Sequence, residues 1–302
     1  MQIGVPSKRH LRSLVLLCVA LTSVFLAISR VVRSADQRVA VASKPLITIT
    51  YGRDPLQVAD LRVPARRGRI PVAVLIHGGC WQSDANARSG LAGFADALGK
   101  RGFATWNVEY RGIGYPGGGW PGTFQDVAAA VDKLAEIAPR YRLDMTSVTI
   151  VGHSAGAHLA LWVVSRPKLP RPWSATTLRP VSVVAIDGPG ALETFVGPDA
   201  RSCGHPVIVP LMGGTPAEKP VEYRLASPAN HLPLGLHQIL IGADLKDVMR
   251  PYVAAAEASG DTVDVYDPNR AHHFDVVTRG NKYGEAVADL IAAKALVPTS
   301  AK

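Results

Sequence analysis

The five residues Gly152-His153-Ser154-Ala155-Gly156 decide how this sequence folds, because they join a strand directly to a helix. The residues at 147–151 are apolar and β-branched, and those at 155–164 suit a helix. The five fit the pattern Gly-x-Ser-x-Gly, in which the serine stands on a sharp strand-to-helix turn. Bulk at either glycine would collide with the neighbouring strand and helix. The pattern predicts Ser154 as a nucleophile lifted above the edge of a sheet.

On both sides of this turn, short apolar runs alternate with amphipathic stretches. Strands are predicted at 46–51, 57–63, 71–76, 103–108, 147–151, 181–186, 237–241 and 262–266, and helices at 87–100, 124–137, 155–164, 249–258 and 283–296. The first two strands suit a hairpin. The later alternation predicts parallel pairing through right-handed crossovers. The fold class is therefore α/β, a doubly wound and mostly parallel sheet.

The segment 188–236 breaks this alternation. It is rich in proline and glycine and has no clear period. We interpret it as a lid-like insertion over the carboxyl edge of the sheet, where such folds bind their ligands. Its apolar side chains are expected either to line a pocket or to pack on the core; they are Phe195, Val207, Ile208, Val209, Leu211 and Met212.

The first 35 residues differ from the rest of the chain. An uncharged run at 13–29 follows three basic residues and precedes two more, and residues 1–35 contain no acidic residue. This pattern predicts either a cleaved signal peptide or an N-terminal membrane anchor. The catalytic domain is then 36–302, placed outside the cytoplasm in the periplasm, in the medium or at the membrane.

The charge and the cysteines set further bounds. The net charge is +9, of which five charges lie in the leader, leaving +4 for the domain. That balance, without a basic cluster, argues against a nucleic-acid partner. Outside the leader the cysteines are Cys80 and Cys203, and one disulfide is permitted in an oxidising compartment. No spacing of cysteine and histidine predicts a metal site.

A serine hydroxyl needs a base to take its proton, and that base should follow the last strand. The sequence there is Ala271-His272-His273-Phe274-Asp275. We predict His273 as the base, with His272 as the alternative. His158 and His231 lie elsewhere in the chain and are not expected to act.

The acid that orients the histidine should end a late strand. Asp244 follows the apolar run 239–241 by a short turn and precedes His273 by about 30 residues, in the expected order Ser, acid, His. We predict Asp244 as the acid. Asp247 is a near alternative, and Asp187, which ends an earlier strand, is a more distant one.

A glycine pair follows the strand at 71–76, in His77-Gly78-Gly79-Cys80-Trp81. Adjacent glycines allow backbone N–H groups to turn towards a developing oxyanion. We predict an oxyanion hole formed by the N–H groups of Gly79, Cys80 and Ala155.

Four stretches resemble a known group of enzymes. They are HGGCW at 77–81, EYRG at 109–112, GHSAGAHLA at 152–160 and HHFDVV at 272–277. They are similar to the arylformamidase-like and feruloyl-esterase-like carboxylesterases of the α/β-hydrolase superfamily, over about residues 47–296. The resemblance implies that the chain hydrolyses a small-molecule ester or amide and uses no cofactor.

Three functions follow from these patterns. The first is a serine esterase that cleaves small carboxylic esters through an acyl-enzyme on Ser154. The second is an N-formyl amidase. In that reaction His273 would have to protonate the leaving amine as a general acid, because an amine leaves poorly without a proton. The third is a binding protein that has the fold without the chemistry. The leader argues against the cytoplasmic kynurenine formamidases of the group.

Overall fold

The computed structural model describes residues 43–83 and 87–296. The predicted leader, 1–35, lies outside these residues. Within the described ranges, no helix has both the length and the apolar character needed to cross a membrane.

The described residues build one eight-stranded sheet. In spatial order the strands are β1 (Ile47–Thr50), β2 (Val58–Arg62), β4 (Ala104–Val108), β3 (Ile70–Ile76), β5 (Leu143–His153), β6 (Ser182–Ile186), β7 (His237–Ile241) and β8 (Val263–Tyr266). The pairs β1–β2 and β2–β4 are antiparallel, and every other pair is parallel. The predicted fold class is confirmed, and it is that of the α/β-hydrolases.

Both faces of the sheet are buried, so its central strands are almost wholly apolar. In β3, Val72, Val74 and Ile76 belong to one core, while Ala73 and Leu75 belong to the other. This alternation is the two-residue period of a strand, here covered by helices on both sides.

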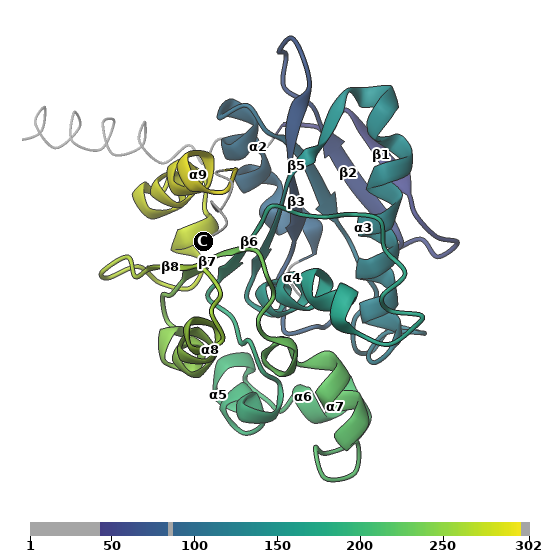
Figure 1. Cartoon of the computed structure of the whole chain (residues 1–302), viewed down its shortest axis with the longest axis vertical. Helices are drawn as coiled ribbons and strands as arrows, with labels where there is room; N and C mark the ends of the chain where they lie inside the picture. Colours follow the sequence, from purple (N-terminus) through teal and green to yellow (C-terminus); the bar gives the residue numbers. More distant parts are fainter. Residues whose placement is uncertain (1–42, 84–86, 297–302) are drawn as a thin grey trace, which may run out of the picture. The chain divides into compact units, whose positions relative to one another are not determined.

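The helices form the two outer layers (Figure 1). One core contains side chains of α3 (Gly122–Tyr141), α4 (Ala155–Ser165) and α8 (Lys246–Ala258). The opposite core contains those of α2 (Ala92–Lys100) and α9 (Lys282–Lys294). The helix predicted at 87–100 begins instead with the 3₁₀ turn η1 (Arg88–Leu91).

The insertion between β6 and β7 is ordered into short helices. They are η3 (Glu193–Phe195), α5 (Pro198–Cys203), α6 (Ile208–Met212), α7 (Pro220–Ala226) and η4 (Pro228–His231). All of its expected apolar side chains except Val209 are at most 2% exposed and belong to the main core. These side chains therefore pack on the body of the domain.

A buried carboxylate holds the middle of the insertion together. Asp199 accepts hydrogen bonds from the N–H groups of Gly197 and Ala200 at one oxygen, both at 2.9 Å. Its other oxygen accepts from Val207 at 2.8 Å and Ile208 at 2.9 Å. The carboxylate thus joins the first turn of α5 to the first turn of α6. Burial favours the neutral acid, yet these four hydrogen bonds hold the pKa of Asp199 below its usual value.

Asp199→Asn should destabilise the fold, because an amide nitrogen cannot accept from the two N–H groups that it would face. Each unpaired buried donor costs about 1–3 kcal/mol, so we expect the melting temperature to fall by roughly 5–15 °C. The depressed pKa adds stability above about pH 4, which is lost as the pH falls through the folded-state pKa. Thermal unfolding at a series of pH values should therefore show a flatter acid limb in the variant.

Asp247→Asn is the matched control, since the Asp247 carboxylate is exposed and pairs with Arg250 one turn away on the surface. Equal melting temperatures for the two variants at neutral pH would refute this role of Asp199.

Candidate active site

Ser154 stands between β5 and α4 in a backbone conformation that L-residues rarely adopt. Its φ is 57° and its ψ is −122°. Such strain costs about 1–3 kcal/mol and persists only where surrounding contacts impose it. Here the Ser154 N–H donates to Ile186 O at 2.8 Å, which fixes the turn against the end of β6.

The two glycines of the motif are required by close packing. A Cβ on Gly152 would lie 1.9 Å from the carbonyl oxygen of Gly156. A Cβ on Gly156 would lie 2.0 Å from the carbonyl oxygen of Ile76, at the end of β3. Helix α4 therefore begins in direct contact with the sheet, as the sequence pattern predicts.

An aspartate and a histidine from distant segments meet beside this turn. His273 Nδ1 and Asp187 Oδ2 are 2.6 Å apart, and the Asp187 side chain is fully buried. Asp187 directly follows β6, the neighbour of β5 in the sheet. Its second oxygen accepts from the N–H groups of Ala243 at 2.7 Å and Leu245 at 2.8 Å. The carboxylate is thus fixed on both oxygens.

The structure corrects the predicted acid. Asp244 does not reach the imidazole of His273; it accepts from the backbone N–H of His273 at 2.9 Å and lies 3.5 Å from the ring of His272. Its side chain is half exposed. The loop after β7 contributes its backbone N–H groups to Asp187 rather than an acid of its own. Asp247, the near alternative, points to Arg250 on the surface.

His153, which sequence reasoning did not single out, anchors the loop that carries His273. Its Nε2 lies 2.8 Å from His273 O, and the two rings are 4.5 Å apart between centroids. Burial, and then the neighbouring His273, lowers the pKa of His153 to about 3. His153 is therefore neutral at physiological pH and donates its Nε2 proton to this carbonyl. The sequence offers no signal for the contact beyond its place beside Ser154.

The Ser154 turn is thus connected to His273 through the adjacent residue. Within residues 43–83 and 87–296, no direct hydrogen bond joins Ser154 Oγ to the His273 ring. Catalytic hydrogen bonds are often long without substrate and tighten when it binds. Phe274, 56% exposed, packs against both His153 and His273.

The predicted oxyanion residues form a tight left-handed turn next to Ser154. Gly79, Cys80 and Trp81 have φ values of 102°, 53° and 56°, and Gln82 N donates to Gly79 O at 2.9 Å. A Cβ on Gly78 would lie 2.7 Å from Ser154 Cβ, so this backbone packs directly on the serine.

The predicted oxyanion donors have free N–H groups in this arrangement. Among the described residues, no protein acceptor takes the N–H of Gly79, Cys80 or Ala155. Ala155 is the first residue of α4, where helix N–H groups have no partner within the helix and carry partial positive charge. The arrangement can stabilise a negative oxygen that develops near Ser154.

A buried network of charged and polar side chains supports the start of the turn at residues 79–81. His77 Nε2 lies 2.7 Å from Glu109 Oε1, and Arg88 donates to Glu109 Oε2 through its backbone N–H at 3.1 Å and its guanidinium at 3.3 Å. Burial alone would raise the pKa of Glu109, but the hydrogen bond from His77 and its other donors lower it. The Tyr110 hydroxyl donates to His77 O at 2.9 Å and fixes the start of the turn.

The two histidines set aside on sequence grounds lie apart from this constellation. His158 is fully buried in α4 and donates through Nε2 to Ala226 O at 2.9 Å, and burial lowers its pKa to about 4. His231 ends η4 in the insertion. The described part of the chain contains no cluster of three or more His, Cys, Asp or Glu side chains arranged to hold a metal ion.

Comparison of the sequence with known families gives a match over more than half of the chain. A family model described as BD-FAE matches residues 59–258. Two probable isoprenylcysteine alpha-carbonyl methylesterases of Oryza sativa subsp. japonica are 29% and 28% identical over 114 and 116 residues. These matches cover 37% and 38% of this chain, and only 26% and 27% of the rice proteins.

Solved structures share the fold over most of the chain. A truncated carbohydrate esterase from gut microbiota has a TM-score of 0.68 at 19% identity, over 84% of this chain and 97% of its own. Esterase B from Lactobacillus rhamnosis has a TM-score of 0.67 at 20% identity, over 91% and 96%. An esterase from Thermogutta terrifontis has a TM-score of 0.65 at 16% identity, over 87% and 98%.

The contact between His273 and Asp187 predicts a spectroscopic difference between two variants. The proton on His273 Nδ1 is shared with a buried carboxylate, so it should exchange slowly and give a far-downfield proton NMR resonance. Asp187→Asn should remove this resonance, and Asp244→Asn should keep it. Loss of the resonance in Asp244→Asn alone would restore Asp244 as the partner of the ring.

Proposed function

Because the chain belongs to the BD-FAE family, we propose that it hydrolyses carboxylic esters, with Ser154 attacking the ester carbonyl and carrying the acyl group as a covalent intermediate. The observation that carries this proposal is the His273–Asp187 contact beside the strained Ser154 turn. A base fixed by a buried acid, next to a serine on a strained turn, is the arrangement that activates a serine hydroxyl.

Each group has a defined part in this proposed reaction. His273 Nε2 takes the proton of Ser154 Oγ during attack and returns it to the leaving alcohol. Asp187 keeps the proton of His273 on Nδ1 and stabilises the imidazolium that forms. Water then attacks the acyl-enzyme, with His273 again acting as the base, and Ser154 is regenerated.

The oxyanion formed in both steps lies near the N–H groups of Gly79, Cys80 and Ala155. Removal of one such donor typically costs about 3–4 kcal/mol of transition-state stabilisation. Neutral His153 supplies no competing positive charge, so it acts by holding the backbone of His273 in place.

We further propose that the preferred substrates are small esters. Phe195 of the insertion packs against Trp81, which directly follows Cys80. Leu211 and Met212 are buried in the same core, and this close packing supports a substrate with a short acyl chain. Hydrophobic pockets discriminate by about 1–3 kcal/mol per methylene, so acyl-chain preference should be steep.

Ser154→Ala should abolish turnover while the fold stays intact. We expect kcat to fall by about 10⁴-fold or more, because catalytic groups that act as a unit fail together. The measurement is hydrolysis of nitrophenyl esters of graded acyl length, with N-formylkynurenine as the amide comparator, together with labelling by a fluorophosphonate probe.

Ser202→Ala is the matched control, because Ser202 is an exposed serine on α5. A tenth of wild-type turnover remaining in Ser154→Ala would reject the serine assignment. A preference for the formyl amide over every ester would favour the amidase alternative.

We also propose that the domain works outside the cytoplasm. The basic and apolar leader supports this, and so does the disulfide between Cys80 and Cys203, since such bonds persist in oxidising compartments. Intact-mass analysis of fractionated cells should find the domain outside the cytoplasm, either without the leader or held by it at the membrane. Full-length chain in the cytoplasmic fraction would contradict the proposal.

A further inference from the structure

The turn that carries Cys80 needs support from outside itself. Cys80 and Trp81 both have a positive backbone φ. Residues other than glycine, asparagine and aspartate rarely adopt this conformation. The single hydrogen bond from Gln82 N to Gly79 O closes the turn but leaves its orientation free. Contacts with neighbouring segments must therefore set the direction of the Cys80 N–H.

One side of the turn is held by the loop after β4. Ile113 N donates to Trp81 O at 2.6 Å, and Gly112 N donates to Ser83 Oγ at 2.7 Å. The Trp81 ring is 1% exposed, so it is also fixed by packing. These contacts hold residues that follow Cys80 in the sequence and do not fix Cys80 itself.

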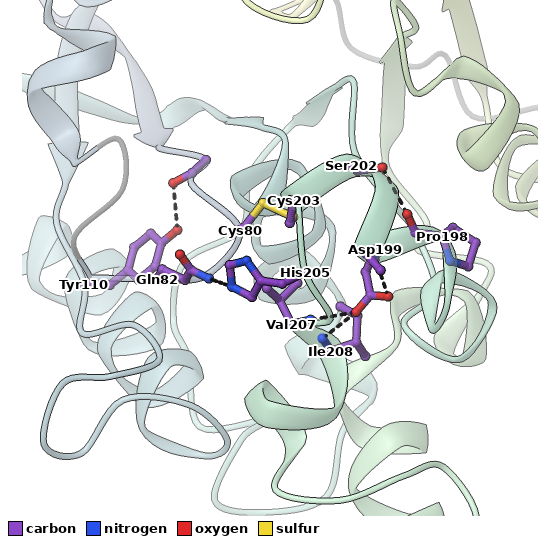
Figure 2. The surroundings of a disulfide bond; sticks show 12 residues. Cys80, Gln82, Tyr110, Pro198, Asp199, Ser202, Cys203, His205, Val207 and Ile208 are labelled. Carbon is purple, nitrogen blue, oxygen red and sulfur yellow. Dashed lines mark hydrogen bonds between the residues drawn. A yellow bond between two sulfur atoms is a disulfide. The ribbon is translucent and has the colours of Figure 1, made fainter.

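The other side is tied to the insertion by two bonds (Figure 2). Cys80 forms a disulfide with Cys203, and their Cα atoms are 6.1 Å apart. The bond joins two residues that are 123 positions apart in the sequence. Two positions further along each segment, Gln82 Nε2 lies 2.6 Å from His205 Nε2. The turn and the end of α5 are therefore joined at two points, one covalent and one by hydrogen bonding.

The insertion end of this tether is itself rigid. Asp199 ties α5 to α6 through four backbone N–H groups, and Val207 and Ile208 are buried in the main core. The disulfide therefore connects the turn to a fixed point on the domain. A tether to a loose loop would not restrict the turn in this way.

We propose that the Cys80–Cys203 disulfide, with the Gln82–His205 contact beside it, is a positioning device that aims the Cys80 N–H at the oxyanion. This inference rests on the proposed function of Ser154. It makes the rate of ester cleavage depend on the oxidised tether, while substrate binding depends on it little. A dithiol that delivers two electrons and two protons would break the S–S bond, leave two thiols and release the turn.

The test compares Cys203→Ala with Ser202→Ala, its neighbour on the same helix. A misplacement of about 1 Å can lower the rate about 100-fold, so kcat of Cys203→Ala should fall about 10- to 100-fold with KM nearly unchanged. Amide hydrogen exchange at residues 79–83 should become faster in Cys203→Ala and stay at the wild-type rate in Ser202→Ala. Assays are run well below the melting temperature of each variant.

Two further measurements cover the case in which Cys203→Ala does not fold. His205→Ala keeps the disulfide and should lower kcat a few-fold, again without raising KM. Wild-type protein treated with dithiothreitol should lose kcat as two thiols appear in a thiol titration, and regain it on reoxidation.

The outcomes separate this inference from the proposed function. Full kcat in Cys203→Ala, or in wild-type protein in which reduction has released two additional thiols, would overturn the positioning role and leave only a stabilising one. If wild-type protein hydrolyses no ester, the proposed function fails. Amide exchange then tests by itself whether the disulfide restrains the turn. An unchanged exchange rate at residues 79–83 in Cys203→Ala would overturn that restraint.

Discussion

Parallel pairing of β3, β5, β6 and β7 is the constraint on which the rest of the structure depends. It brings the carboxyl ends of four strands to the same edge of the sheet. The glycine-rich turn that carries Cys80 follows β3, Ser154 follows β5 and Asp187 follows β6. Segments far apart in the chain therefore meet without any long connection between them, and the loop after β8 adds His273 at the same edge.

The site is held by backbone groups at least as much as by side chains. The N–H groups after β7 fix Asp187, and the carbonyl of His273 accepts from His153. Both oxygens of the buried Asp187 carboxylate are paired, as a buried charge requires, whereas His153 Nδ1 has no hydrogen-bond partner among the described residues. Burial also keeps His153 neutral, so a second imidazole can lie against the ring of His273 without placing a positive charge beside it.

The insertion is tied directly to the turn that carries Cys80. Its apolar side chains extend the core beyond the sheet, and its helices α5 and α6 provide an anchor for the turn at Cys80. The same turn is held from inside the domain by the buried His77–Glu109 pair and Tyr110. A strained backbone between two anchors is suited to a group that must not move during the reaction.

The sequence by itself determined the fold class, the strand-to-helix turn at Ser154 and the glycine-rich turn near Cys80, because each depends on local periodicity or on residues adjacent in the chain. It located most strands and helices to within a few residues for the same reason. It identified Asp187 only as a distant alternative to Asp244, since both follow apolar strands and chain order does not distinguish them. The tertiary structure alone showed that Asp187 is the one that contacts the ring of His273: β6 lies next to β5, and the loop after β7 offers two N–H groups to Asp187. It alone also decided the contact of His153 with His273 and the pairing of Cys80 with Cys203, because these depend on distances between segments that no local pattern records.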